Sequence, residues 1–347
     1  MTKEDTGLLS YPIPEPPEFG DYVEVAQGVL WLRFPLPMTL DHVNIYLFDE
    51  GDSWTVVDTG FDSKKGRAIW NAVLAKLGKP VRRVIVTHHH PDHVGLAGWF
   101  QTEHGAQLVT TRTAWLFARM LTLDEQAVPK SETLDYWRSA GVTPDEIEAR
   151  KKKRPFNFSD IVAPMPLGFS RIKEGDRMRL GGRDWTVRIG NGHAPEHATF
   201  WSDDDELVIG GDQLLPSISP NLGVYATEPE ADPVAEWIES CERLAQFAHA
   251  DQLVLPGHKL PFRGLPARLR QLIGNHHGAL ERLLERLREP LTAIECFDVL
   301  FKRKIDSGTF EMALVEAVAH LNHLHQLGEV TRKRHDNGAW VWQKIGS

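Results

Sequence analysis

Apolar and polar positions along the first third of the chain predict strands interrupted by one helix. Runs of β-branched and aromatic residues, several of them alternating with polar ones, predict strands at 23–34, 43–48 and 53–60. Residues 62–78 instead carry apolar side chains at helical spacing and end at a glycine, so they predict a helix before the next strand at 81–87. This order of strands and helix is typical of an α/β layered fold.

The pattern turns helical between residue 112 and about residue 165. This stretch follows a predicted strand at 106–111, contains three helix-like segments and has no strand pattern of its own, so we expect a helical insertion. Four short strands are predicted after it, at 177–182, 184–190, 197–202 and 206–211. A helix at 232–248 and a last strand at 251–258 follow them.

The last part of the chain, residues 276–347, is again mostly helical and ends in a hairpin. Helices are predicted at 278–287, 291–303 and 311–328, and Asp336-Asn337-Gly338 is a hairpin turn between two short strands. Three helices and a two-stranded wing predict a winged-helix-like domain. We therefore expect a leader at 1–21, an α/β domain at 22–265 that carries the insertion, and a winged-helix-like domain at 276–347.

Composition places the chain among ordinary globular proteins. Hydrophobic residues are 41% and charged residues 25% of the 347 positions, and no apolar window is long enough to cross a membrane. The first twenty residues are rich in proline and acidic side chains rather than in the basic and apolar residues of an export signal. We expect a cytoplasmic protein without a membrane partner.

Charge argues against nucleic acid as the main partner. The whole chain has a formal net charge of −9, and residues 276–347 contain ten basic and ten acidic side chains, which balance to zero. Winged-helix domains that bind nucleic acid normally need a positive excess, because phosphate contacts supply most of the affinity. We therefore expect the C-terminal domain to pack on the α/β domain or on a second subunit in a homodimer.

Four histidines and an aspartate lie between positions 88 and 93, directly after a predicted strand. Alternate side chains of an extended segment point the same way, so His88 and His90 can reach one ion while His89 faces elsewhere. Asp92 and His93, at the start of a helix-like segment, can reach a second ion. Imidazole and carboxylate are ligands that zinc, iron and manganese accept. The alternative is an exposed polar loop.

Further candidate ligands follow other predicted strands. They are His193 in NGHAPEH, Asp212 in GGDQ and His258 in LPGHK, and Asp58-Thr59-Gly60 follows an early strand. With these motifs in this order, residues 22–265 resemble the metallo-β-lactamase-fold hydrolases, in particular a subfamily with a C-terminal winged-helix domain and glyoxalase II-like and ribonuclease-like relatives. The resemblance implies an α/β fold built as a four-layer αββα sandwich.

The resemblance also implies a site for two divalent metal ions, with zinc favoured and iron or manganese as alternatives. The implied ligands are His88, His90 and His193 for one ion and Asp92, His93 and His258 for the other, with Asp212 bridging both. Asp58 would then hold a ligand histidine in its tautomer. His197 would support a ligand or face the substrate, with a plain buried histidine as the alternative. Lys259 stands where many relatives have glycine, and we expect it to be exposed to solvent, with a cation near the rim of the pocket as the alternative.

The reaction that this site implies is metal-dependent hydrolysis. A hydroxide held between the two ions and oriented by Asp92 would attack the carbonyl of an ester or thioester. A metal-dependent endoribonuclease or phosphodiesterase using the same site is the alternative. Trp115, Tyr136 and Trp137 of the insertion are candidates for the wall of an acyl pocket, or else pack the insertion onto the protein. The basic run at 150–154 could contact a carrier-linked substrate, or simply be a solvated helix end.

Overall fold

The computed structural model describes residues 9–301 and 304–346, which form two compact units. The first unit contains the described residues up to 125 together with 156–220 and 243–269. The second contains 126–155, 221–242 and the described residues from 270 onward. The predicted insertion at 112–165 is therefore divided between the two units.

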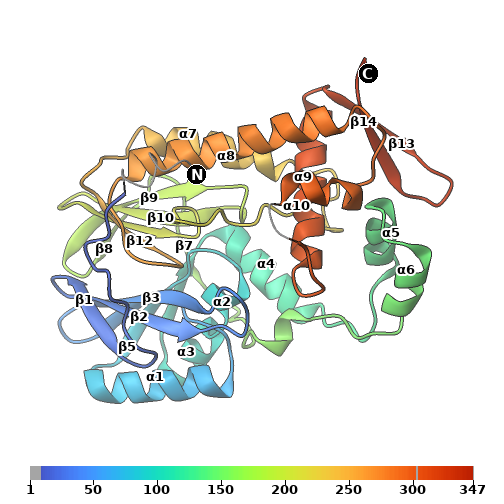
Figure 1. Ribbon diagram of the computed structural model, residues 1–347. Helices are drawn as coiled ribbons and strands as arrows, with labels where there is room; N and C mark the ends of the chain where they lie inside the picture. Colours follow the sequence, from blue (N-terminus) through green and yellow to red (C-terminus); the bar gives the residue numbers. More distant parts are fainter. Residues whose placement is uncertain (1–8, 302–303, 347) are drawn as a thin grey trace. The chain divides into compact units, whose positions relative to one another are not determined.

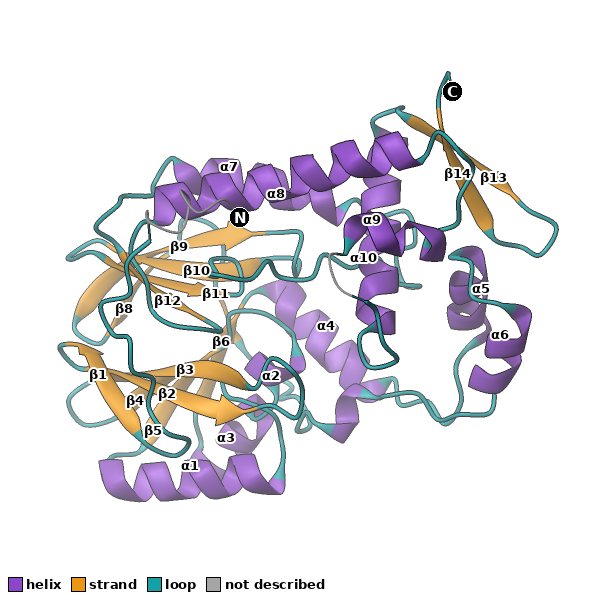
Figure 2. Cartoon of the chain, in the orientation of Figure 1, coloured by secondary structure: helices purple, strands orange, loops and turns teal. Residues whose placement is uncertain are grey.

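The larger of two sheets in the first unit has seven strands in the order β1-β2-β3-β4-β5-β6-β7 (Figures 1 and 2). The first four strands pair antiparallel and the last four pair parallel, and α1 connects the parallel strands β4 and β5. The strands are Tyr22–Ala26, Val29–Pro35, His42–Asp49, Trp54–Val57, Val81–Ile85, Gln107–Thr110 and Ser170–Arg171. The predicted strand at 23–34 is thus two strands, because the chain turns at Gly28, whose φ of 71° favours glycine.

The second sheet has five strands in the order β12-β11-β10-β9-β8. Only β11 and β12 pair parallel, and the other neighbours are antiparallel. The strands are β8 Arg177–Leu180, β9 Arg183–Gly190, β10 His197–Ser202, β11 Leu207–Gly211 and β12 Leu253–Pro256, each within a predicted strand or within one residue of it. Short polar turns between the antiparallel strands explain why these elements could be predicted from alternation alone.

The two sheets face each other across a core of buried apolar side chains. Trp31 and Phe48 of the first sheet and Trp185 and Phe200 of the second belong to this core. The rings of Phe48 and Trp185 meet edge to face with centroids 5.8 Å apart, a favourable geometry for aromatic pairs. Sheet-on-sheet packing of this kind brings the ends of strands from both sheets to one edge.

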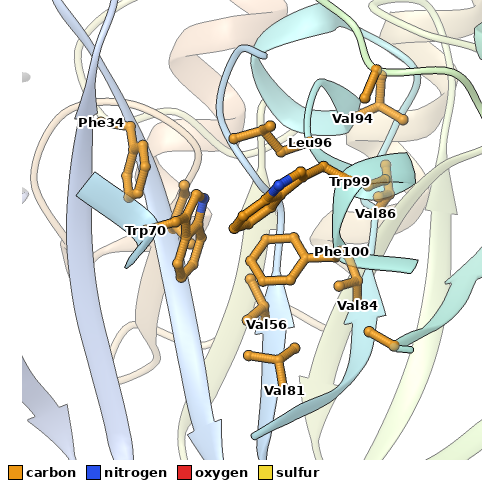
Figure 3. Close-up of a cluster of buried hydrophobic side chains, with 14 of the residues drawn as sticks. Phe34, Val56, Trp70, Val81, Val84, Val86, Val94, Leu96, Trp99 and Phe100 are labelled. Atoms are coloured by element: carbon orange, nitrogen blue, oxygen red, sulfur yellow. The ribbon is translucent and has the colours of Figure 1, made fainter. Parts of the chain in front are cut away.

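Helices cover the outer face of the first sheet. They are α1 Lys64–Leu77, α2 Pro91–Val94 and α3 Ala97–His104. Trp70 of α1 lies fully buried between Phe34 and Phe100, with ring centroids 4.9 and 4.8 Å away (Figure 3). The Trp70 indole N–H also donates to the carbonyl of Thr59, 2.8 Å away, so this packing fixes the loop after β4. On the outer face of the second sheet, the Arg188 guanidinium lies over the Phe247 ring, at 3.2 Å from its centroid.

The insertion is helical, as predicted, and the wholly described range 112–165 contains no strand. Its elements are α4 Arg112–Leu123 in the first unit, α5 Ser131–Ser139 and α6 Pro144–Arg150 in the second, and the short 3₁₀ helix η2 Phe158–Asp160 in the first. The side chain of Thr111 caps α4, and Thr143 with Glu146 forms a capping box on α6.

The C-terminal region differs from its prediction in two elements. Helix α8 spans Leu265–Arg286, so it begins well before the predicted start at 278. The predicted helix at 291–303 is reduced to the 3₁₀ helix η3 Ile294–Cys296 and α9 Phe297–Leu300, and its last two residues lie outside the described residues. The remaining elements are α7 Pro233–Ala245, α10 Phe310–Gln326, β13 Val330–Arg334 and β14 Trp340–Lys344. The winged-helix assignment of this region stays a prediction.

The described part of the leader, residues 9–21, is attached to the first unit. Ser10 and Arg263 exchange backbone hydrogen bonds of 3.3 and 2.9 Å, and Ile13 packs against the core between the sheets. Among the described residues, no helix combines the length and the apolar character that crossing a bilayer requires.

Candidate metal centre

The predicted ligands gather where four strands end. The segment 88–93 follows β5, His193 follows β9, Asp212 follows β11 and His258 follows β12. Ligand atoms within 4.8 Å of one another form three groups: His88 with His90 and His193, His88 with His93 and Asp212, and Asp92 with His93 and His258. The first and third groups are the two triads that the family resemblance implies. The structure thus brings all seven predicted ligands together, while metal binding by them stays a prediction.

The loop 88–93 takes its shape from proline. Pro91 occupies the first turn of α2, where its missing N–H costs nothing and its fixed φ favours the helix. His90 precedes it in extended conformation, with a φ of −63° and a ψ of 148°. The change from extended chain to helix turns Asp92 and His93 toward the ligands on the other strands.

Asp212 lies between the two triads. Its Oδ2 is 3.2 Å from His258 Nε2 and 3.5 Å from His193 Nε2, and its Oδ1 is 3.4 Å from His93 Nε2. Asp92 Oδ2 lies 3.4 Å from His258 Nε2. One carboxylate therefore faces histidines of both triads, the position that a bridging ligand requires.

Several buried ligand atoms have no hydrogen-bond partner in the described part of the chain. They include His88 Nε2, His93 Nε2 and Asp212 Oδ1. A buried polar atom without a partner costs about 1–3 kcal/mol, and such atoms normally occur only where water or an ion satisfies them. These side chains and their chemistry therefore fit divalent metal ions.

Further hydrogen bonds orient the ligand rings. Asp58, buried at the end of β4, accepts from His93 Nδ1 at 2.8 Å, from the Thr87 N–H at 2.8 Å and from the Thr87 hydroxyl at 2.9 Å. His258 Nδ1 donates to the His42 carbonyl at 2.7 Å. In both histidines the Nδ1 proton is used in this way, so Nε2 is left to face the centre, the usual arrangement for metal-binding histidines.

The electrostatics of the centre favour added positive charge. Burial acts to lower the pKa of His258, but Asp212 and Asp92 outweigh it and raise that pKa to about 10. Burial likewise opposes ionisation of Asp212, yet His258 and His93 hold its pKa well below the usual range. By contrast, burial and the neighbouring imidazoles lower the pKa of His88 well below normal. The negative charge of the buried carboxylates therefore favours cations in the centre, as a metal-binding site requires.

Two other histidines have separate roles. His197 is fully buried, and its Nε2 accepts the backbone N–H of Asp212 at 3.1 Å, a contact that fits the predicted role of supporting a ligand, while the substrate-facing role stays a prediction. Burial lowers the pKa of His197 to about 3, which keeps the ring neutral and able to accept this bond. His89 belongs to none of the three groups and packs with its ring centroid 5.1 Å from that of Phe117 on α4.

Two family models match this chain. The family model described as the metallo-beta-lactamase superfamily matches residues 38–258, nearly two thirds of the chain. The chain belongs to the metallo-beta-lactamase superfamily. A second model, the metallo-beta-lactamase-like C-terminal domain, matches residues 280–345. The resemblance read from the motifs is thereby confirmed, and members of the superfamily use divalent metals.

Similar proteins from the superfamily align with nearly the whole length of this chain. The crystal structure of a beta-lactamase domain protein from Burkholderia ambifaria is 36% identical, with a TM-score of 0.90 over 99% of this chain and 100% of that one. A metallo-beta-lactamase family protein from Thermus thermophilus is 28% identical, with a TM-score of 0.77 over 92% and 100%. The probable metallo-hydrolase YqjP of Bacillus subtilis is 26% identical over 88% of this chain and 94% of its own. The predicted fold class is confirmed, and the chain is related to metallo-hydrolases.

The three candidate substrate-binding residues each have packing partners. The Trp115 ring stacks on Phe169 with centroids 4.9 Å apart, and its indole N–H donates to the Pro166 carbonyl. In the second unit, the buried Tyr136 hydroxyl donates to the Val224 carbonyl at 2.6 Å. Trp137 lies under the Arg150 guanidinium at 4.7 Å. These contacts are those of the packing alternative, and substrate binding by the three residues stays a prediction.

Sequence reasoning missed two residues that shape the centre. Thr87 donates twice to Asp58, and its hydroxyl also lies 3.0 Å from His88 Nδ1. Gly257 approaches the ligands so closely that an added Cβ would lie 2.2 Å from Asp212 Oδ1 and 2.8 Å from His93 Cε1. The only signal for either was its position next to a ligand histidine, which does not reveal contacts with Asp58 or Asp212.

We expect Gly257→Ala to lower the affinity for metal by at least about tenfold, because the new methyl group must displace the Asp212 carboxylate. Its backbone cannot yield easily, since its N–H donates to the Gly211 carbonyl and its carbonyl accepts the Asn44 N–H. Competition with a chromogenic chelator measures the effect. The matched control is Gly274→Ala in α8, where a Cβ meets open space. Equal metal affinity in the two variants would contradict the prediction.

Proposed function

We propose that this chain is a dinuclear-metal hydrolase that cleaves the ester or thioester bond of a small acyl substrate. The observation that carries the proposal is the position of Asp212 between two ligand triads that share one buried centre. Ligand sets rich in imidazole suit zinc, which we infer to be the metal. When bound, the two ions would supply Lewis acidity and lower the pKa of a coordinated water.

Asp92 is the residue best placed to orient the attacking water. Its side chain is 16% exposed, against 8% for Asp212 and 3% for Asp58, so it is the most accessible carboxylate of the three. Its Oδ2 also contacts His258 Nε2, which keeps the carboxylate at the centre. We propose that Asp92 accepts a hydrogen bond from the water and directs its lone pair toward the carbonyl carbon.

The contacts and the exposed apolar face of helix α4 favour an acyl group as the substrate. Its Thr113 N–H donates to Glu196 at 2.8 Å, in the loop between His193 and His197, and its Phe117 packs on His89. Leu116, Met120 and Leu123 follow one another at helical spacing on α4 and are exposed. An apolar face on a helix that contacts two of the four ligand-bearing loops suits the hydrocarbon part of an acyl group.

The alternative is a phosphodiesterase or endoribonuclease that uses the same centre. The net charge of −9 and the zero balance of residues 276–347 disfavour it, since RNA binding depends on phosphate contacts. The basic run also has local partners: Arg150 pairs with Glu311 at 2.7 Å, and Lys151 pairs with Glu148. A carrier-linked substrate would have to bind without these two cations.

Rates on matched substrates test the proposal. We expect the metal-loaded protein to cleave para-nitrophenyl esters and acyl thioesters at least about tenfold faster than bis(para-nitrophenyl) phosphate or RNA, with the difference in kcat/KM reflecting transition-state binding. Met120→Ser should weaken cleavage of long acyl chains more than that of acetyl esters, because it removes apolar contact. If RNA or the phosphodiester turns over faster than every ester, thioester and lactone, the alternative replaces the proposal.

A further inference from the structure

A small cavity lies beside the metal ligand His258. It has a volume of about 230 Å³ and is lined by both polar and apolar residues of the first unit, namely Tyr11, Pro16, Arg33, His42, Ser217, Lys259 and Leu260. Two of these residues are cations, and no carboxylate is among the lining residues in the part of the chain that the structure describes. The lining residues of the cavity thus carry positive charge, and the neighbouring carboxylate of Asp41 contacts Arg33 and His42.

Lys259 is held in a conformation that favours glycine. Its φ is 69°, in the left-handed region that is unfavourable for a residue with a Cβ. Its N–H donates to His42 Nε2 at 3.0 Å, and its carbonyl accepts from the buried Asn44 side chain at 2.7 Å. Strained residues of this kind cluster at functional sites. The expectation that Lys259 is exposed to solvent was wrong, because it is half-buried and lines the cavity.

Arg33 brings a second, incompletely paired cation. Its side chain is 16% exposed, and its Nε is buried without a hydrogen-bond partner. The Asp41 carboxylate lies 3.7 Å from Arg33 Nη2, beyond hydrogen-bond distance, and already accepts from His42 Nδ1 at 2.6 Å. Burial lowers the pKa of Arg33 although Asp41 and Glu18 act to raise it. The guanidinium thus retains hydrogen-bonding capacity that an added anion would satisfy.

We propose that this cavity binds an anionic group, a carboxylate or a phosphate, that is part of the substrate cleaved at the metal centre. Lys259 directly follows His258, and His258 Nδ1 donates to the carbonyl of His42, so cavity and centre share a wall. A volume of about 230 Å³ is below the roughly 300–1,000 Å³ of pockets for whole ligands, so the cavity takes one end of a molecule. The inference rests on the proposed hydrolase function.

The test compares an anionic and a neutral ester of matched shape, mono-para-nitrophenyl adipate and para-nitrophenyl 6-methylheptanoate. We expect the ratio of their kcat/KM values to fall about tenfold in Lys259→Met, since the variant loses a charged hydrogen-bond donor for the anionic ester. Lys259→Gly, which relieves the backbone strain, should lower the ratio equally and keeps the test valid if the methionine variant folds poorly. Lys259→Arg should restore the ratio.

The matched control is Lys64→Met on the exposed start of α1, which should keep the wild-type ratio. A ratio that stays at its wild-type value in both Lys259→Met and Lys259→Gly, or that falls as far in Lys64→Met, overturns the inference. Because neither outcome requires fast turnover of a particular acyl group, the result does not depend on which ester is the better substrate.

Calorimetry separates this inference from the proposed function. Succinate and inorganic phosphate, titrated separately into the metal-loaded protein, should each bind about tenfold more weakly to Lys259→Met than to wild type, and the tighter anion identifies the group. If wild type cleaves neither ester but anion binding depends on Lys259, the hydrolase proposal fails and the anion site stands. Equal binding by wild type and Lys259→Met overturns the anion site whatever the activity.

Discussion

Asp212→Ala should remove both metal ions and reduce hydrolysis by at least about a thousandfold, equivalent to about 4 kcal/mol of transition-state stabilisation. The reason is that one carboxylate serves both triads, with Oδ1 facing His93 and Oδ2 facing His193 and His258. Without it, the two ions would also lose the negative charge that balances them. Metal analysis of the purified protein should find close to two ions per wild-type chain and almost none in the variant.

The control for this experiment is Asp251→Ala, because Asp251 is an exposed aspartate in the same unit. It should retain the wild-type metal content and rate. An Asp212→Ala protein that lacks metal but hydrolyses esters at the wild-type rate would refute the dinuclear site as the source of activity.

Asp58→Asn should weaken metal binding by about 10- to 100-fold while leaving the backbone intact. Asparagine tolerates the left-handed φ of 62° that Asp58 adopts, so the substitution changes charge and hydrogen bonding alone. The new amide cannot accept from Thr87 and His93 as two carboxylate oxygens do, and its own N–H₂ would face existing donors. The His93 ring then loses the partner that holds its Nδ1 proton.

Chelator competition on wild type, Asp58→Asn and Asp52→Asn measures the difference. Asp52 lies in the exposed turn before β4, where its partner is Arg82 at 3.3 Å, so its variant should bind metal as wild type does. Unchanged affinity in Asp58→Asn would show that the orientation of His93 does not depend on this carboxylate.

The positions of the ligands in the fold could be read from the sequence because each one follows a strand with a strong local signal. The strands before Asp212 and His258 are short, apolar and buried, the strand before His88 buries its valines and isoleucine but carries two arginines, and the ends of all three meet at one edge of the sandwich. The supporting contacts could not be read in this way. Thr87 meets Asp58 across β4 and β5, and Gly257 meets Asp212 across β11 and β12, so these contacts exist only once strands that are separated in the sequence have paired within each sheet.

The failures in the C-terminal region have tertiary causes. Gly274 and Asn275 resemble a helix stop, yet α8 continues through them to bury His276. Packing of buried side chains thus outweighs the roughly 1 kcal/mol that an internal glycine costs. Leu291, predicted as the first residue of a helix, instead forms a β-bridge with Trp342 of the hairpin. A partner about fifty positions along the chain cannot be inferred from local spacing.

The division of the ligands between two sheets bears on how the protein matures. Each triad takes two members from the loop after β5 and its third from a strand end of the other sheet, His193 for one triad and His258 for the other. A nascent chain that has completed only the first sheet therefore has two ligands for each ion and no bridge. We therefore expect metal to bind only after the two sheets have packed together, as a late step of assembly and not as a nucleus for folding.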